Sequence, residues 1–173
     1  MTDLNPIDLD IKNKIRCCAI IEHLVHITLT VSIAGTDQQQ QRVVSFLLGR
    51  VGVCALGAVV ANLQGNQQMV DYYLAKFKEI DVSKDFQSEM IGGKAGYLWA
   101  CLFLNKNLGH ETILPAHTTA IVDEIIENGR KLGEKGRCPL MFESNGEQYW
   151  GVAHGLAGIM HVLMHFVLEI LKR

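Results

Sequence analysis

The sequence lacks an excess of positive charge. Its 16 Lys and Arg residues are outnumbered by 18 Asp and Glu residues and are scattered along the chain, which gives a net charge of −2. A domain that binds nucleic acid needs a concentrated basic field to attract the phosphate backbone. We therefore expect no nucleic-acid partner.

Cysteine is present but has no regular spacing. The five cysteines are Cys17, Cys18, Cys54, Cys101 and Cys138, an odd number without a C-x-x-C pair. Disulfide frameworks and self-contained zinc fingers need paired or closely spaced thiols. The pattern indicates reduced thiols in a cytoplasmic protein.

Signals for targeting and for membrane insertion are also missing. The start, MTDLNPIDLDIKNK, is acidic and polar where a secretory signal would be basic and then apolar. The two most apolar stretches, residues 15–35 and 152–171, contain histidines and charged groups, and each charge at a bilayer centre costs about 2.5–3.5 kcal/mol. We therefore predict no transmembrane span.

What the chain does contain is helical periodicity. Alternating runs of β-branched residues are scarce, whereas apolar residues recur at helical spacing. The predicted fold class is all-α. The expected helices are Ile11 to Ala34, Val53 to Asn62, Gln67 to Ile80, Tyr97 to Asn105, Ala116 to Leu132 and Leu156 to Leu171.

The same short pattern opens three of these helices. The pattern is G-x-x-G, and it occurs at residues 49–52, 93–96 and 155–158, each time before an apolar helix. The first glycines are 44 and then 62 residues apart, which favours a repeated helical hairpin with loops of variable length over a strict solenoid. We expect inner apolar helices, each backed by an outer amphipathic helix.

Three longer segments resemble the LanC-like proteins, the eukaryotic relatives of bacterial lanthionine cyclases, and especially their plant members. These segments are FLLGRVGVCALGAVVAN, GGKAGYLWACLFLNKNLG and CPLMFESNGEQYWGVAHGLAGIMHVLM, in that order, and the resemblance covers roughly residues 43–168. It implies an α/α toroid of seven helical hairpins with glycine-rich loops at a central active site. We expect residues 1–42 to form an N-terminal helical segment and residues 43–173 to form a partial toroid of about three hairpins.

The resemblance also implies a chemistry, which is the addition of a cysteine or glutathione thiol to a dehydroamino acid. In the family, zinc held by two cysteines and a histidine in W-C-H-G and C-H-G motifs converts the thiol to a thiolate. Neither motif occurs in this sequence, so we assign no zinc ligand and expect no cofactor in this chain. The expectation that follows is a truncated form that is inactive alone, with glutathione or a modified peptide as the family substrate.

Two residues are candidates for catalysis. His154 matches the histidine of the family's A-H-G-L-A-G motif, which implies a role in proton transfer, and its place before a helix start keeps the neutral imidazole available. Glu89 stands four residues before Gly93, where the bacterial family has an acidic residue, usually Asp. The alternatives are that His154 caps the helix or forms a hydrogen bond within the glycine-rich loop, and that Glu89 is a solvated loop carboxylate, whose extra methylene shifts the acid by more than about 1 Å. Tyr149 and Trp150 are expected to pack this loop.

The remaining polar residues are expected to be structural. Lys94 is interpreted as an exposed loop cation and Cys138 as a spectator. His161 and His165 are spaced i, i+4 and could in principle hold zinc together with His154. A long apolar helix more often holds such residues as core or interface groups, so we predict no metal site.

Two other classes of function remain open. An incomplete ring would expose apolar inner helices that seek a protein partner. The chain would then be a non-catalytic interaction or signalling module. The resemblance to plant members implies association with hormone response or a peripheral place at the plasma membrane, and the expected location is cytoplasmic. α/α toroids also house glycosidases, which need two carboxylates across a cleft; Glu89 and Glu143 are the nearest candidates, and neither lies in a supporting motif.

Overall fold

The computed structural model describes residues 44–82, 86–109, 111–134, 136 and 138–171. Within these residues the helices are α2 (Arg50–Leu63), α3 (Gln67–Lys78), α4 (Lys94–Leu108), α5 (Pro115–Gly133) and α6 (Leu156–Leu171). A short hairpin pairs strand β1 (Glu143–Ser144) with strand β2 (Glu147–Gln148). The predicted all-α class is confirmed, and the helix expected at Ile11 to Ala34 lies outside the described residues.

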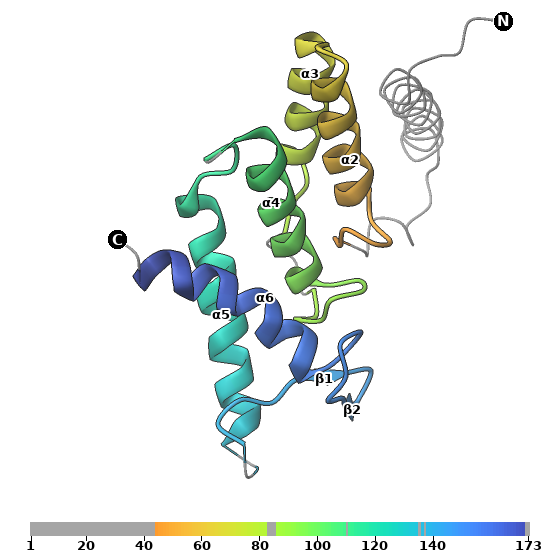
Figure 1. The fold of residues 1–173 in the computed structure, drawn as a ribbon. Helices are drawn as coiled ribbons and strands as arrows, with labels where there is room; N and C mark the ends of the chain where they lie inside the picture. The colour runs from red at the N-terminus through yellow and green to blue at the C-terminus, as the bar shows by residue number, and fades with distance from the viewer. Residues whose placement is uncertain (1–43, 83–85, 110, 135, 137, 172–173) are drawn as a thin grey trace, which may run out of the picture.

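The helices form two layers (Figure 1). α2 packs against α3 and α4, and α4 packs against α5 and α6. Thus α2, α4 and α6 follow one another in the inner layer, while α3 and α5 back α2 and α4 from outside. This is the repeated hairpin expected from the sequence, with α6 as the first helix of a third repeat. None of the described helices combines the length and apolar character that a bilayer-spanning helix needs.

α4 contributes to two hydrophobic cores because it is apolar around most of its surface. Tyr97 on one side packs with α2 and α3, and its ring stacks on Phe77 at a centroid distance of 5.3 Å. Leu98 on the other side packs with Ile125 of α5 and Ile159 of α6. The two cores make α4 the element that fixes the positions of the neighbouring hairpins.

The loops before the inner helices cap those helices in a repeated way. The first N–H of α4, at Lys94, donates to the carbonyl of Gln87 at 2.9 Å, and the first N–H of α6, at Leu156, donates to the carbonyl of Tyr149 at 3.0 Å. In both repeats the next N–H also donates to a carbonyl seven residues earlier, at 3.3 Å in α4 and 3.2 Å in α6. First-turn N–H groups that lack helical partners are thereby satisfied without a capping side chain.

This capping explains the second glycine of each G-x-x-G. A Cβ on Gly52 would lie 1.8 Å from the carbonyl oxygen of Phe46, and a Cβ on Gly96 would lie 2.3 Å from that of Met90. The loop therefore lies flat against the first helical turn, where only glycine leaves room. From the sequence, α2 and α4 were predicted to start at Val53 and Tyr97, three residues after the observed starts, because these glycines were assigned to the loops.

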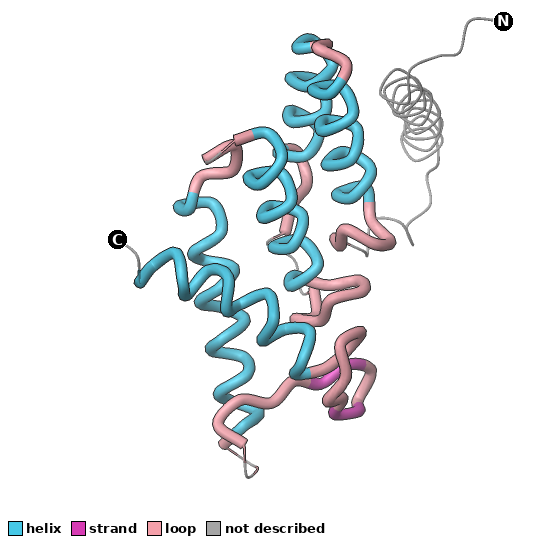
Figure 2. The backbone as a smooth tube through the Cα atoms, viewed as in Figure 1, coloured by secondary structure: helices cyan, strands magenta, loops and turns pink. Residues whose placement is uncertain are grey.

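The three loops lie in a row at one end of the inner layer, and we call residues 44–49, 86–93 and 149–155 the loop row. The N–H of Val44 donates to the carbonyl of Gly92 at 3.1 Å, which joins the first loop to the second. The N–H groups of Met90 and Ile91 both donate to the carbonyl of Ala153 at 3.2 Å, which joins the second loop to the third. Figure 2 shows these loops together at the starts of α2, α4 and α6. Residues distant in sequence meet there.

The β-hairpin was missed in the sequence analysis. Its turn residues Asn145 and Gly146 have φ angles of 52° and 83°, as a two-residue hairpin turn with the sequence Asn-Gly requires. Ser144 donates a hydrogen bond of 2.7 Å to the side-chain oxygen of Gln87. The hairpin is thereby tied to the second loop of the row.

Candidate functional site

His154 and Glu89 meet in the loop row. Glu89 belongs to the second loop and His154 to the third, immediately before Gly155. Nδ1 of His154 is hydrogen-bonded to Oε2 of Glu89, across 65 residues of sequence. Backbone carbonyls cap α6, so His154 is not its cap, whereas the alternative of a hydrogen bond within the glycine-rich loops agrees with this contact. The two catalytic candidates named from the sequence thus form a single pair.

The carboxylate of Glu89 is buried and held from two directions. Glu89 is only 7% exposed, and its Oε1 accepts a hydrogen bond of 2.6 Å from the N–H of Gly92. The alternative of a solvated loop carboxylate is therefore wrong. The side chain of His154 is 40% exposed, so the imidazole is the member of the pair that a ligand can reach.

The pair has the geometry of a proton-transfer group with an orienting partner. Because Nδ1 of His154 is hydrogen-bonded to Glu89, Nε2 is the ring nitrogen that is available to contact a ligand. A carboxylate behind an imidazole fixes the tautomer and the ring orientation and stabilises the protonated ring. The ring of Tyr149 lies against that of His154, with centroids 5.7 Å apart, as expected of a loop-packing residue, whereas Trp150 is 62% exposed.

Lys94 is not the exposed loop cation that the sequence suggested. It is the first residue of α4 and only 1% exposed. Its Nζ forms an ion pair with Oε1 of Glu124 on α5. The interpretation was wrong because it treated the G-x-x-G segment as a free loop, whereas the segment forms the first turn of a helix that packs against α5.

The described cysteines do not fit the zinc site that the family resemblance implies. Cys54 in α2 and Cys101 in α4 are buried free thiols, and Cys138 is partly exposed. Burial raises the pKa of Cys54 to about 11 and also raises the pKa of Cys101, so both stay protonated thiols at neutral pH. Within the described part of the chain, no group of three or more His, Cys, Asp or Glu residues is arranged to hold a metal ion.

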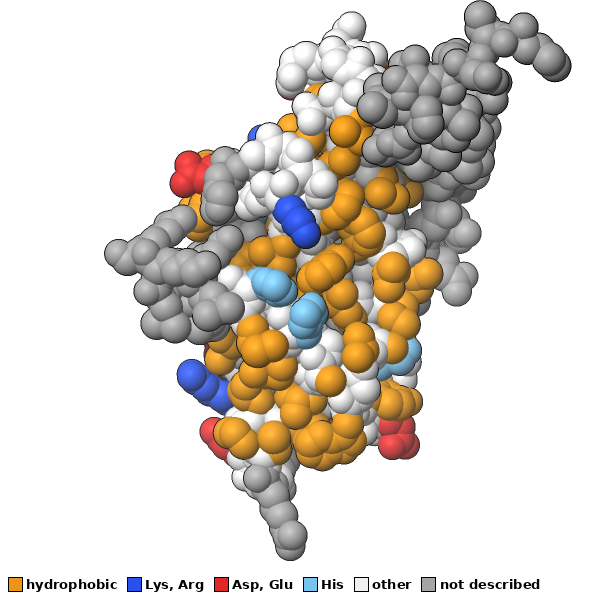
Figure 3. All heavy atoms as spheres, viewed as in Figure 1, with side chains coloured by type: hydrophobic (Ala, Val, Ile, Leu, Met, Phe, Trp, Pro, Cys, Tyr) orange, Lys and Arg blue, Asp and Glu red, His pale blue; other side chains and the backbone are white. Residues whose placement is uncertain are grey.

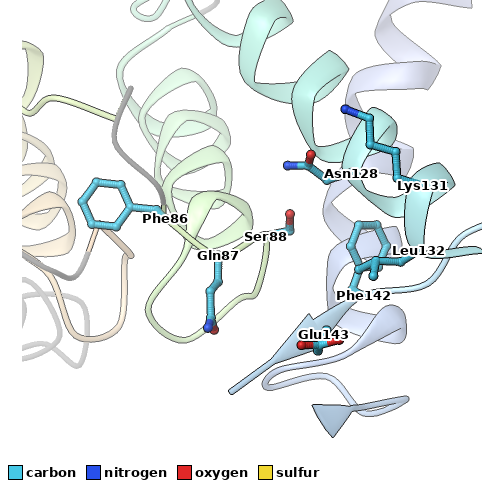
Figure 4. A pocket seen from close by; sticks show the side chains of 8 residues that line it. All are labelled: Phe86, Gln87, Ser88, Asn128, Lys131, Leu132, Phe142 and Glu143. Atoms are coloured by element: carbon cyan, nitrogen blue, oxygen red, sulfur yellow. The ribbon is translucent and has the colours of Figure 1, made fainter. Parts of the chain in front are cut away.

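A pocket of about 350 Å³ lies between the second loop of the row and α5 (Figure 4). Its lining side chains are Phe86, Gln87, Ser88, Asn128, Lys131, Leu132, Phe142 and Glu143. Glu143, the second carboxylate of the glycosidase alternative, lines this pocket, whereas Glu89 is directed to His154. The two carboxylates therefore do not face each other as a glycosidase pair would.

Comparison with known proteins gives a consistent result. The sequence model of the lanthionine synthetase C-like protein family matches residues 16–172. The chain is 40% identical over 148 residues to LanC-like protein GCL1 of Arabidopsis thaliana, which covers 79% of this chain and 34% of that protein. It is 34% identical over 133 residues to a protein of Danio rerio named Glutathione S-transferase LANCL1, covering 72% of this chain and 33% of that protein. The chain thus spans about a third of the length of these relatives.

Proposed function

This chain belongs to the lanthionine synthetase C-like family, and from that premise we propose that it carries the proton-transfer part of a site that adds a thiol to a dehydroamino acid. The observation that supports the proposal is the contact between His154 and Glu89 in the loop row. Because the fish relative is named a glutathione S-transferase, we propose glutathione as the thiol. The proposed acceptor is a peptide that contains dehydroalanine or dehydrobutyrine.

The reaction assigns a role to each member of the pair. The thiolate sulfur forms a bond to the β-carbon, and the electron pair of the double bond moves through the α-carbon to the carbonyl oxygen, which gives an enolate. The enolate then takes a proton at the α-carbon, and this replaces the proton that the thiol lost. In the proposal, Nε2 of His154 donates that proton, while the carboxylate of Glu89 orients the ring and stabilises its protonated form.

The described residues do not supply the first requirement of the reaction, which is the thiolate. A free thiol is mostly protonated at neutral pH, and the described cysteines do not form a zinc site. Metal activation of a nucleophile is worth several kcal/mol of barrier. We therefore propose that this chain does not accelerate the addition when it is alone.

The inactivity of the isolated chain can be tested directly. The chain is incubated with glutathione and a dehydroalanine peptide at pH 7, and the thioether product is measured by mass spectrometry. We expect no product above the uncatalysed background. Robust product that disappears in His154→Ala would contradict the proposed inactivity, while robust product that persists in this variant would also contradict the role of His154.

A second candidate function is an interaction module, and the exposed apolar side chains favour it. Large exposed residues include Leu47, Leu48, Leu63, Val152 and Met164. Figure 3 shows that apolar side chains cover much of one face of the molecule, and a large exposed apolar patch is typical of an interface with another protein. We propose a cytoplasmic location for such a module, and we expect sedimentation to show a dimer or larger species; a monodisperse monomer would argue against obligatory association.

A further inference from the structure

Two histidines on α6 lie together outside the candidate site. His161 and His165 are one helical turn apart and exposed, and their ring centroids are 5.2 Å apart with an interplanar angle of 89°. Trp99 of α4 lies beside both, with centroid distances of 5.6 Å to His161 and 6.1 Å to His165. Figure 3 shows neighbouring histidine side chains over α6, within a face that is largely apolar.

We propose that His161 and His165 form a bidentate site for a divalent transition metal ion. A metal bound to an imidazole nitrogen at about 2.0–2.1 Å lies about 3.2 Å from the ring centroid. Two imidazoles at adjacent positions of a square-planar or tetrahedral ion therefore have centroids about 4.5–5.2 Å apart. The observed separation of 5.2 Å lies at the upper end of this range, and because the rings meet edge to face, the side chains rotate on binding to turn one nitrogen of each ring toward the ion.

The sequence favoured a role for these histidines as core or interface groups. His161 and His165 are both exposed, so they are not core groups, whereas a place on an accessible face is compatible with their exposure. Their neutral imidazoles are good ligands for copper, nickel and zinc ions, and a spacing of i, i+4 brings two such ligands to the same helix face.

The expected ion follows from the donor set. For nitrogen ligands the affinity order places Cu²⁺ above both Ni²⁺ and Zn²⁺. Because the described residues provide no group of three suitable ligands, the remaining coordination positions are open to water or to a ligand from solution. The site is separate from the His154–Glu89 pair: six residues lie between His154 and His161, and the five steps from Leu156, where α6 begins, to His161 already span about 7.5 Å along the helix.

Trp99 provides a local reporter for the experiment. The chain has two tryptophans, Trp99 and Trp150, so the variant Trp150→Phe leaves Trp99 as the single emitter. CuCl₂, NiCl₂ and ZnCl₂ are titrated into this variant, and we expect Cu²⁺ to quench its fluorescence saturably with a stoichiometry of one. Because loss of one imidazole removes the chelate, His161→Ala and His165→Ala are each expected to weaken Cu²⁺ binding on the order of 10²-fold.

Two controls separate this site from other histidines. His117→Ala removes an exposed imidazole on α5 and is expected to leave the Cu²⁺ titration unchanged. Electron paramagnetic resonance of the bound Cu²⁺ is expected to show two imidazole nitrogens, and circular dichroism checks that each variant stays helical. Quenching that does not saturate, or that survives both single substitutions in folded protein, overturns the proposal. Loss of quenching only in His154→Ala also overturns it, because the metal would then lie at the candidate site.

Discussion

Replacing Gly158 by alanine is expected to lower the free energy of unfolding by about 3 kcal/mol. A Cβ at this position would lie 1.9 Å from the carbonyl oxygen of Val152. This oxygen belongs to the backbone of the third loop, so no side-chain rotation relieves the clash. The loop would have to leave the first turn of α6, and the carbonyls of Tyr149 and Trp150 would no longer cap that helix.

Gly151→Ala in the same loop is the matched control. No atom lies within 4 Å of a Cβ built on Gly151, so this change is expected to alter the free energy of unfolding by less than about 0.5 kcal/mol. Urea denaturation followed by circular dichroism gives the midpoint and slope for each variant. Equal midpoints for Gly158→Ala and Gly151→Ala would show that the loop does not lie against the helix as described.

The helices could be predicted because their signals are local. α6 has the predicted bounds, and α3 ends at Lys78 where Ile80 was predicted. The starts of α2 and α4 were predicted late because glycine is a poor helix former, by about 1 kcal/mol relative to alanine. Packing of a loop carbonyl over the second glycine outweighs this preference, and that contact is tertiary. The Asn145-Gly146 turn, by contrast, was a local signal that could have revealed the hairpin.

The candidate site could be predicted only in part. The sequence identified His154 and Glu89 separately, through the motifs that resemble the family. Their contact depends on backbone bonds from Met90 and Ile91 to Ala153 in the next loop, and no local pattern encodes these bonds. The burial of Lys94 likewise depends on a helix 30 residues away in sequence. The sequence therefore identified the residue types of the site, but it did not reveal which residues contact one another in the folded chain.

The loop row explains why glycine-led helices and the candidate pair occur together. Each loop lies flat on its own helix because glycine permits it, and neighbouring loops of the row are then close enough to bond to each other. Glu89 and His154 are therefore placed by the same loops that cap the helices. A substitution that destabilises the loop row is therefore also expected to misalign His154 and Glu89.

In a fusion of this chain with the zinc-binding part of a LanC-like enzyme, His154→Ala is expected to lower kcat for glutathione addition by about 10²–10⁴-fold. The thiolate would still form, because zinc would be held by the fused part and not by His154, whose Nδ1 is bonded to Glu89. Protonation of the enolate would lose its positioned donor. The rate is measured by mass spectrometry of the thioether, and zinc content is measured in the same preparations.

Substitutions of Glu89 in the same fusion test the proposed positioning role. Glu89→Gln is expected to lower kcat with little change in KM, because the carboxylate acts on the protonated ring of His154 and not on substrate binding. Glu89→Asp is expected to retain more activity than Glu89→Gln, since a carboxylate remains and the bacterial family usually has Asp at this position. Glu147→Gln, in an exposed strand, is the neutral control. If His154→Ala kept kcat within about threefold of the parent fusion, at equal zinc content, proton transfer by His154 would be contradicted.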